Sequence, residues 1–222
     1  PILVGRPGVI ERRIERFGLR LEKNVDYTIT DPEHDERYKD YWQTFYELTK
    51  RQGVTESYAR LEVRRRNTLI GALMVRKGQA DGLICGIIGN PTAHLHYIDV
   101  TIGHQAGTDI YAAMNALVLP DRQIFIADTH INYDPSAEQL AEITRLAAAE
   151  MRSFSITPKV ALVSHSNFGS SQMPSAEKMR KVLEILRQTN PELEVETKIK
   201  ILLSYQGLIE MDTHYKEQAF EL

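Results

Sequence analysis

Apolar positions in the second half of the chain follow two alternating patterns. Short apolar runs at Gln123–Ala127 and 160–163 are typical of buried strands, and residues 193–195 begin a third such run. Residues 137–154 and 176–188 instead carry apolar side chains three and four positions apart, which predicts helices. An order of strand, helix, strand, helix, strand is typical of parallel β/α units. The pattern therefore predicts an α/β fold for this half.

The rest of the chain follows similar patterns. We expect strands at 1–5, 25–29, 80–89 and within 109–120, helices at 9–17, 40–51 and 93–102, and a polar loop at 30–39. The strand that ends at Pro120 is predicted to form a hairpin-like pair with Gln123–Ala127, because only a short turn separates them. Thr55 and Thr92 are predicted N-caps. The helix at 40–51 carries an aromatic stripe, which favours a core or an interface and consists of Tyr41, Trp42, Phe45 and Tyr46.

Composition narrows the class of protein. The chain has 222 residues, of which 42% are apolar and 26% charged, and this suits one large or two small globular domains. The net charge of -3 gives no strong attraction to nucleic acid or membrane, so neither is expected as a partner. A single cysteine, Cys85, excludes an internal disulfide framework and fits a reducing compartment, so we expect a cytoplasmic protein. No apolar run reaches the ~18 residues of a membrane span, and no signal peptide is visible.

A small polar segment follows the apolar run at 160–163. Its polar or flexible residues are Ser164, Ser166, Asn167, Gly169, Ser170 and Ser171. A helical pattern begins shortly afterwards, after Pro174. Free N–H groups in such a loop and the dipole of the following helix both favour an anion, at the edge of a parallel sheet where ligands bind. The segment matches neither a P-loop nor a nucleophile elbow, and an ordinary turn is the alternative interpretation.

A second polar segment follows the strand at Gln123–Ala127. Its polar residues alternate along the chain, and they are Asp128, His130, Asn132 and Asp134. A calcium loop would need Gly at its sixth position and Glu at its twelfth, where this sequence has Tyr133 and Gln139, so calcium is excluded. We instead expect Asp134 to be the N-cap of the next helix, with Pro135 at its first position.

Two other groups of residues were considered as sites. His94, His96 and His104 suggest a metal, but His94 and His96 face different sides of a helix, so no metal site is expected. The basic runs at 64–66 and 76–77 are typical of a solvated helical face, and binding of nucleotide phosphates is the alternative.

The segments at 127–143 and 158–171 together resemble the phosphate acetyltransferase (phosphotransacetylase) family. Residues 1–7, 74–75, 78, 80–82 and 86 fit the same family. The variant at 164–171, with that at 113–117, looks most like the phosphotransacetylase-like domain fused behind bacterial NADP-dependent malic enzymes. The resemblance covers roughly residues 1–195, and the sequence departs from the family pattern at Glu196.

This resemblance implies a fold, a ligand and a division into domains. The fold would consist of two three-layer α/β/α domains with an interdomain cleft, of the phosphotransacetylase or isocitrate-dehydrogenase-like type, truncated at both ends. Domain one would be 1–106 and incomplete, domain two 107–195, and 196–222 a divergent tail. The family's cleft binds coenzyme A and phosphate, usually in a dimer, so we expect a homo-oligomer. In the malic enzyme fusions the domain resembles a sensor of acetyl-CoA, and NADP and a divalent metal belong to the separate malic domain.

The resemblance also implies the site. The ligand would contact Asp128, Asn132 and the segment after the strand at 160–163, namely Ser164, Ser166, Asn167, Gly169, Ser170 and Ser171. No catalytic residue is assigned, because the family's essential Ser, Arg and Asp have no counterpart in 196–222. No cofactor or metal is expected in this domain. Three functions stay open: an acetyl-CoA-binding regulatory domain, an active phosphate acetyltransferase, and an oligomerisation scaffold that uses the aromatic stripe as its interface.

Overall fold

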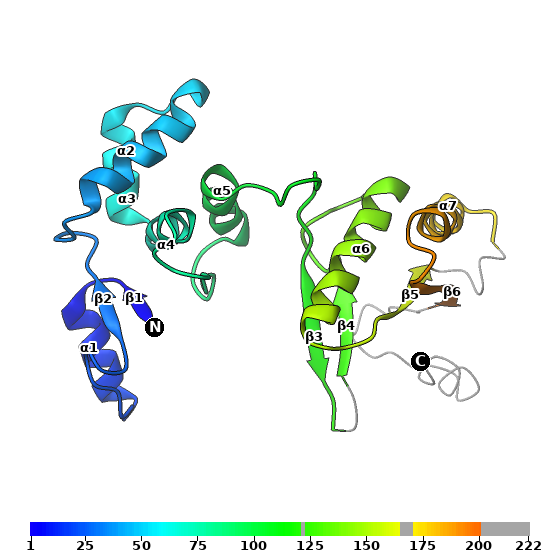
Figure 1. Cartoon of the computed structure of the whole chain (residues 1–222), viewed down its shortest axis with the longest axis horizontal. Coiled ribbons are helices and arrows are strands. Elements are labelled where there is room, and N and C mark those ends of the chain that lie inside the picture. The colour runs from blue at the N-terminus through cyan, green and yellow to red at the C-terminus, as the bar shows by residue number, and fades with distance from the viewer. Residues whose placement is uncertain (121–122, 165–170, 201–222) are drawn as a thin grey trace. The chain divides into compact units, whose positions relative to one another are not determined.

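The structure is a computed structural model that describes residues 1–120, 123–164 and 171–200, with side chains up to residue 195 (Figure 1). The chain divides into two compact units. Unit 1 comprises Pro1–Gln105, and unit 2 begins at Ala106. Each unit is described by itself below.

Unit 1 opens with one parallel β/α/β arrangement. Strand β1 (Ile2–Val4) pairs in parallel with β2 (Thr28–Thr30), and helix α1 (Pro7–Arg16) connects them. Pro7 stands in the first turn of α1, where its missing N–H costs no hydrogen bond. Both strands and the helix were predicted. The second strand begins at residue 28 rather than 25, because Asn24 adopts a left-handed conformation in the turn before it.

Helices form the rest of unit 1. They are α2 (Tyr38–Thr49), the 3₁₀ turn η1 (Lys50–Gln52), α3 (Glu56–Arg65), α4 (Asn67–Arg76) and α5 (Pro91–Thr101). Thr55 caps α3 as predicted, since its hydroxyl accepts from the Tyr58 N–H at 3.3 Å. The prediction for α5 was wrong by two residues. Asn90, not Thr92, is its N-cap, and its side chain accepts from the Thr92 N–H at 2.9 Å.

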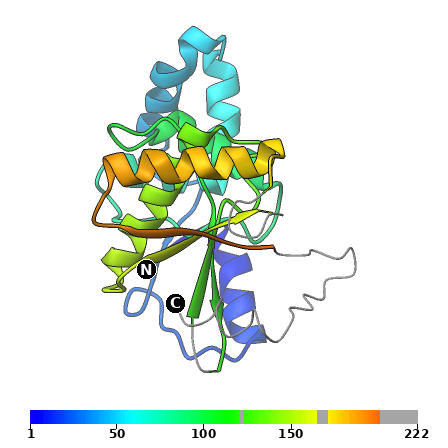
Figure 2. The ribbon, with the colours of Figure 1, turned by 90° about the vertical axis from the view of Figure 1, so that its right-hand side faces the viewer.

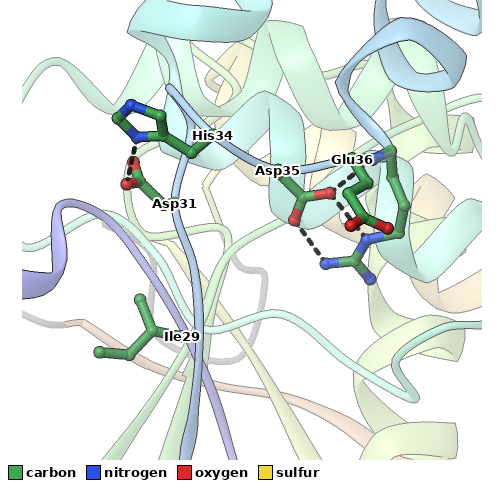
Figure 3. Close-up of a pocket in the computed structure, with 6 residues that line it drawn as sticks. Ile29, Asp31, His34, Asp35 and Glu36 are labelled. Carbon is green, nitrogen blue, oxygen red and sulfur yellow. Dashed lines mark hydrogen bonds and ion pairs between the residues drawn. The ribbon is translucent and has the colours of Figure 1, made fainter.

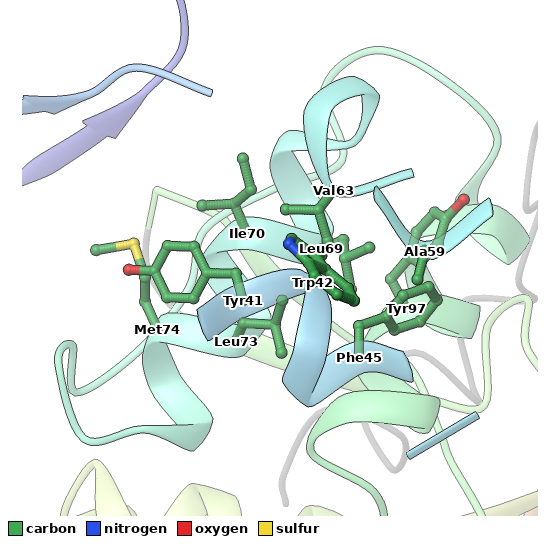
Figure 4. Close-up of a cluster of buried hydrophobic side chains, with 10 residues drawn as sticks. All are labelled: Tyr41, Trp42, Phe45, Ala59, Val63, Leu69, Ile70, Leu73, Met74 and Tyr97. Carbon is green, nitrogen blue, oxygen red and sulfur yellow. The ribbon is translucent and has the colours of Figure 1, made fainter. Parts of the chain in front are cut away.

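The aromatic stripe of α2 is the core of unit 1. Tyr41, Trp42 and Phe45 are buried against α3, α4 and α5 (Figure 4). The other members of this cluster are Ala59, Val63, Leu69, Ile70, Leu73, Met74 and Tyr97. Tyr46 packs against the cluster from its edge. Because these rings lie inside the unit, they do not form the exposed interface that the scaffold hypothesis requires.

Residues 80–89 do not form the buried strand that their apolar character predicts. They carry no strand in the structure, and Ile84 and Ile87 are 97% and 95% exposed. Gly86 and Gly89 have φ values of 105° and 113°, which interrupt an extended backbone. Only the start of the segment is packed, where Leu83 lies so close to Gly71 that a Cβ there would be 2.5 Å from it.

Unit 2 combines a hairpin with a parallel β/α/β unit (Figures 1 and 2). Strands β3 (Met114–Val118) and β4 (Gln123–Ala127) form the predicted antiparallel pair, with Ala116 opposite Phe125. After α6 (Ala137–Ser153), strand β5 (Lys159–Ser164) pairs in parallel with β6 (Glu194–Lys200) across α7 (Pro174–Thr189). The strand–helix order of the sequence is therefore confirmed. The first residues of the predicted divergent tail, 196–200, belong to β6, and 201–222 lie outside the described residues.

Small side chains dominate the helical side of the core of unit 2. Ala137, Ala141 and Ala148 of α6 are buried, and α6 packs against α7. The strands and α7 contribute the remaining buried residues, Leu162, Val182, Leu186, Leu193 and Val195. Because alanine adds little volume, it lets helix backbones approach their neighbours closely.

The start of α6 corrects a predicted cap. Its N-cap is Ser136, whose Oγ accepts from the Gln139 N–H at 3.2 Å, while Gln139 Oε1 accepts from the Ser136 N–H at 2.8 Å. This reciprocal capping box satisfies two helix-end donors at once. Asp134, the predicted cap, instead accepts a hydrogen bond from Lys178 of α7.

The chain is thus an α/β protein, as predicted. None of the helices in the described ranges combines the length and apolar character that a membrane span requires.

Candidate functional site

The predicted ligand residues of unit 2 follow the carboxyl ends of β4 and β5. Asp128 comes directly after β4, and Ser164 is the last residue of β5. Ser171 precedes α7 by two residues. Ser166, Asn167, Gly169 and Ser170 lie outside the described residues.

Asp128 and Asn132 form a hydrogen-bonded pair at the end of the hairpin. Asp128 has a φ of 57°, a left-handed conformation that Asp tolerates better than most residues, and its N–H donates to Ala113 O at 2.8 Å. Its Oδ1 accepts from Asn132 Nδ2 at 2.9 Å, and the same nitrogen donates to Tyr111 O at 2.8 Å. Both amide hydrogens of Asn132 are used in these bonds. What this pair can offer to a ligand is therefore acceptor oxygen, not a donor.

Helix α7 contacts both polar segments. Arg180 donates to Ser171 O at 2.7 Å, and Ser171 Oγ accepts from the Met173 N–H at 3.2 Å. Lys178 Nζ donates to the Asp134 carboxylate and, at 3.0 Å, to Pro135 O. These side-chain contacts join residues of α7 to the end of the segment after β5 and to the end of the segment after β4. Sequence reasoning missed both basic residues, because neither stands in a motif.

One further basic residue of α7 contacts the first turn of α6. Lys181 donates to the Glu138 carboxylate, and this hydrogen bond is the main reason that the pKa of Glu138 falls to about 2. Both side chains are about 60% exposed. Water and salt therefore screen this pair, and we expect little stability from it.

A pocket of about 330 Å³ lies in unit 1 after β2 (Figure 3). It is lined by Ile29, Asp31, His34, Asp35, Glu36 and Arg37. Asp31 Oδ2 lies 2.9 Å from His34 Nδ1, and its Oδ1 accepts from the Glu33 N–H at 3.0 Å. These bonds, the one from Glu33 first, lower the pKa of Asp31.

Arg37 neutralises a second carboxylate of this pocket. It donates to Asp35 through Nε at 2.9 Å and through a terminal nitrogen at 2.7 Å, which lowers the pKa of Asp35. The same guanidinium donates to Thr30 Oγ1 at 3.0 Å. The sequence predicts only a polar loop here. The signal that pointed to the pocket was the carboxylates that follow a strand, but their pairing shows that two of them serve the fold.

The candidate metal and phosphate groups are used within unit 1. His94 Nδ1 lies 2.7 Å from Thr68 Oγ1, and its Nε2 lies 2.9 Å from Ile88 O. No group of three or more His, Cys, Asp or Glu side chains in the described part of the chain could hold a metal ion. Arg64 lies over the Tyr38 ring at 4.4 Å, and Arg66 Nε donates to Glu62 at 3.3 Å. These two arginines thus support the interpretation of a helical face rather than a nucleotide site.

Solved structures show which fold class this is. A phosphotransacetylase from Streptococcus pyogenes superposes with a TM-score of 0.77 at 27% identity, covering 90% of this chain and 60% of that one. The EutD phosphotransacetylase from Staphylococcus aureus gives a TM-score of 0.75 at 22% identity, with 90% and 61% covered. The fold is therefore that of the phosphotransacetylases, as the resemblance implied.

The family follows from the sequence match. The model of the phosphate acetyl/butaryl transferase family matches residues 1–201, and the chain belongs to this family. The NADP-dependent malic enzyme of Escherichia coli is 47% identical over 196 residues, which cover 88% of this chain. The phosphate acetyltransferase of Synechocystis sp. is 32% identical over 200 residues, which cover 89% of this chain. The resemblance is confirmed, and it continues past residue 195, where we expected it to end.

The match covers only part of each relative. The chain spans 26% of the length of the E. coli malic enzyme and 28% of the Synechocystis phosphate acetyltransferase. The activities that these names describe belong to those proteins as wholes.

Proposed function

We propose that this chain is a phosphotransacetylase-like regulatory domain that binds acetyl-CoA and does not itself transfer acetyl groups. The observation that carries the proposal is the difference in identity between the two kinds of relative. The chain is 47% identical to an NADP-dependent malic enzyme but 32% identical to a phosphate acetyltransferase, over nearly equal lengths. In this proposal a separate domain of the same protein oxidises malate to pyruvate with NADP and a divalent metal.

The chemistry of the polar segments suggests how acetyl-CoA would be held. Ser164, Ser166, Asn167, Gly169, Ser170 and Ser171 offer hydroxyl, amide and backbone N–H groups, which suit phosphate oxygens or the acyl carbonyl. Asp128 repels phosphate because its carboxylate is negative. Asp128 and the Asn132 carbonyl oxygen would instead accept from the amide N–H groups of the pantetheine arm.

Regulation requires that acetyl-CoA favour one arrangement of the whole protein. A ligand shifts an equilibrium only by its differential affinity for the two states, and such coupling is typically about 1–3 kcal/mol. A cytoplasmic homo-oligomer, dimer or higher, would let one binding event bias several active sites. This part of the proposal rests on the resemblance to malic enzyme fusions.

Isothermal titration of this chain with acetyl-CoA tests the proposal, with Ser166→Ala as the site variant. Ser153→Ala is the matched control, because Ser153 is exposed and lies at the end of α6, before the opposite end of β5 from Ser164. We expect saturable binding that weakens in Ser166→Ala and not in Ser153→Ala. An absence of heat with the unchanged chain, or equal binding by both variants, would reject the proposed site.

The alternative is an active phosphate acetyltransferase, which the family match and the solved phosphotransacetylase structures favour. Catalysis would position the CoA thiolate against acetyl phosphate and stabilise the developing oxyanion with hydrogen-bond donors. Release of free CoA thiol from acetyl-CoA in the presence of phosphate measures this activity. Turnover by this chain that disappears in Ser166→Ala would favour the alternative over the regulatory domain.

A further inference from the structure

We propose that Lys178 and Arg180 of α7 are positioning residues, which hold the two ligand-binding segments of unit 2 in register with each other. The inference rests on the proposed function and deepens it. It assigns the alignment of the site to one helix, through two side chains that do not themselves contact the ligand. The argument has three steps: the stiffness of the helix, the contact to each segment, and the exclusion of direct ligand binding.

Helix α7 is a fixed support. Ala176 and Val182 are fully buried and Leu186 is 1% exposed, and the helix packs against α6, β5 and β6. Figure 2 shows it lying along the pair of parallel strands. A helix held on one face by its core contacts gives its other side chains defined starting points.

Arg180 holds the end of the segment after β5. Its guanidinium donates to Ser171 O at 2.7 Å, a bond that spans the turn between this segment and α7. Hydrogen bonds from a charged donor are stronger than neutral ones. Removing this donor frees the backbone of the residue from which the segment enters the helix.

Lys178 holds the end of the segment after β4. Its ammonium donates to the Asp134 carboxylate and to Pro135 O, which immediately precede the N-cap of α6. The Lys178 side chain is only 26% exposed, so the contact is partly shielded from water. Side chains two positions apart on a helix point to different sides. Lys178 and Arg180 can therefore reach two different segments from one turn of helix.

A direct role in binding phosphate is the competing explanation. A positive charge near a ligand site attracts an anion whether or not it supports a loop. The position of Asp134 separates the two explanations, because its carboxylate accepts from Lys178 and would repel a phosphate. If Lys178 acts through Asp134, loss of either side chain has the same effect.

The first experiment compares Lys178→Met, Arg180→Met and Lys181→Met in this chain by titration with acetyl-CoA. Lys181→Met is the matched control, because it removes the same charge from the same helix but breaks an exposed pair with Glu138. We expect affinity to fall about tenfold in the first two variants, as loss of a charged hydrogen bond implies, and to change less than about twofold in the control. Equal losses in all three variants, or no loss in the first two, overturn the proposal.

The second experiment separates positioning from ligand contact. Asp134→Asn is expected to weaken binding as much as Lys178→Met, and the double variant no further, because the two residues act as one unit. An Asp134→Asn chain that binds as tightly as the unchanged chain, or more tightly, while Lys178→Met binds weakly, shows direct contact and overturns the proposal.

The third experiment needs no ligand. Hydrogen exchange of the unliganded chain should quicken at 128–135 in Lys178→Met and at 171–173 in Arg180→Met, and at neither in Lys181→Met. Unchanged exchange overturns the proposal even if acetyl-CoA binds. If the unchanged chain shows no binding but exchange rises as expected, the proposed function fails and the ligand part of this inference fails with it, while the role of α7 as a support stands.

Discussion

The two units are held together by different kinds of core. In unit 1, the rings of Tyr41, Trp42 and Phe45 fill the space between helices. In unit 2, Ala137, Ala141 and Ala148 bring α6 close to its neighbours. Large rings fix helices by their volume, whereas small residues fix them by close backbone approach. The comparison teaches that a substitution which is harmful in one unit has an opposite counterpart in the other.

Basic side chains also serve the two units differently. Arg60 lies 4.2 Å from the centre of the Trp42 ring and so extends the aromatic core of unit 1 to its surface. In unit 2, Lys178 and Arg180 contact loop backbone and a loop carboxylate instead. Unit 1 thus uses its cations within a packed face, and unit 2 uses them to hold the segments that carry the candidate site.

The largest effect is expected from a cavity in unit 1. Phe45→Ala removes a ring that is 2% exposed, and such truncations cost about 3–5 kcal/mol in unfolding free energy. Phe17→Ala is the control, because Phe17 is 68% exposed and should change stability by less than about 0.5 kcal/mol. Urea unfolding followed by fluorescence measures both, since the chain has one tryptophan and Trp42 lies in this core. Equal losses in the two variants would contradict the described core.

The opposite change is expected to harm unit 2. Ala148 is 1% exposed, so Ala148→Leu has no room and should cost about 1–3 kcal/mol. Ala149→Leu adds the same side chain one position along, where the helix is exposed, and should be nearly neutral. Far-UV circular dichroism during urea unfolding detects the loss. The contrast between the units would break down if Ala148→Leu stabilised the chain.

A smaller, pH-dependent effect is expected at the pocket of unit 1. Arg37 lowers the pKa of Asp35, so the folded state favours the carboxylate. The resulting stability is fully present above the unfolded pKa of about 3.9 and is lost as the pH falls through the lower folded pKa. Asp35→Asn should therefore cost about 1.5 kcal/mol at neutral pH, and less where the 40% exposed Arg37 side chain is screened by water.

Urea unfolding of the Asp35→Asn and unchanged chains between pH 7 and pH 2 measures this effect. The two stabilities should converge in acid, because the carboxylate that distinguishes the chains becomes protonated. A difference that grows toward low pH would show that the folded pKa of Asp35 is raised instead.

The smallest effect is expected at the start of α6. Ser136→Ala removes the capping hydroxyl and should cost about 1 kcal/mol, while Ser136→Asp keeps an acceptor and should retain most of the stability. The measurement is the thermal unfolding midpoint of the two variants. Equal midpoints for Ser136→Ala and the unchanged chain would mean that the capping box does not limit stability in unit 2.

Local signals made most of the fold predictable. The β/α order of the second half and its hairpin follow from short apolar runs and helical spacing, and both are confirmed. The segment at 80–89 was missed because its isoleucines resemble a buried strand, while the left-handed Gly86 and Gly89 prevent one. The cap at Asp134 was missed because a tertiary partner, Lys178, claims that carboxylate.

The candidate site was predictable only in part. Asp128 and Asn132 lie four residues apart in one segment, so their contact follows from the sequence pattern and the structure brings them together. The contacts of Lys178 join residues from separate helices and loops, and no local pattern identifies such pairs. The ligand role of all these residues stays a prediction until binding is measured.

The contact between Lys178 and Asp134 has a consequence for the order of folding. Its two residues are 44 positions apart, so the segment after β4 is complete long before its anchor leaves the ribosome. Closing a chain segment of this length has an entropic cost, which the packing of α7 must offset first. During synthesis, unit 1 therefore has all of its core side chains before the segment after β4 can be locked in place. The fixed form of that segment is a late product of folding, and a nascent chain that ends before α7 should contain α6 without it.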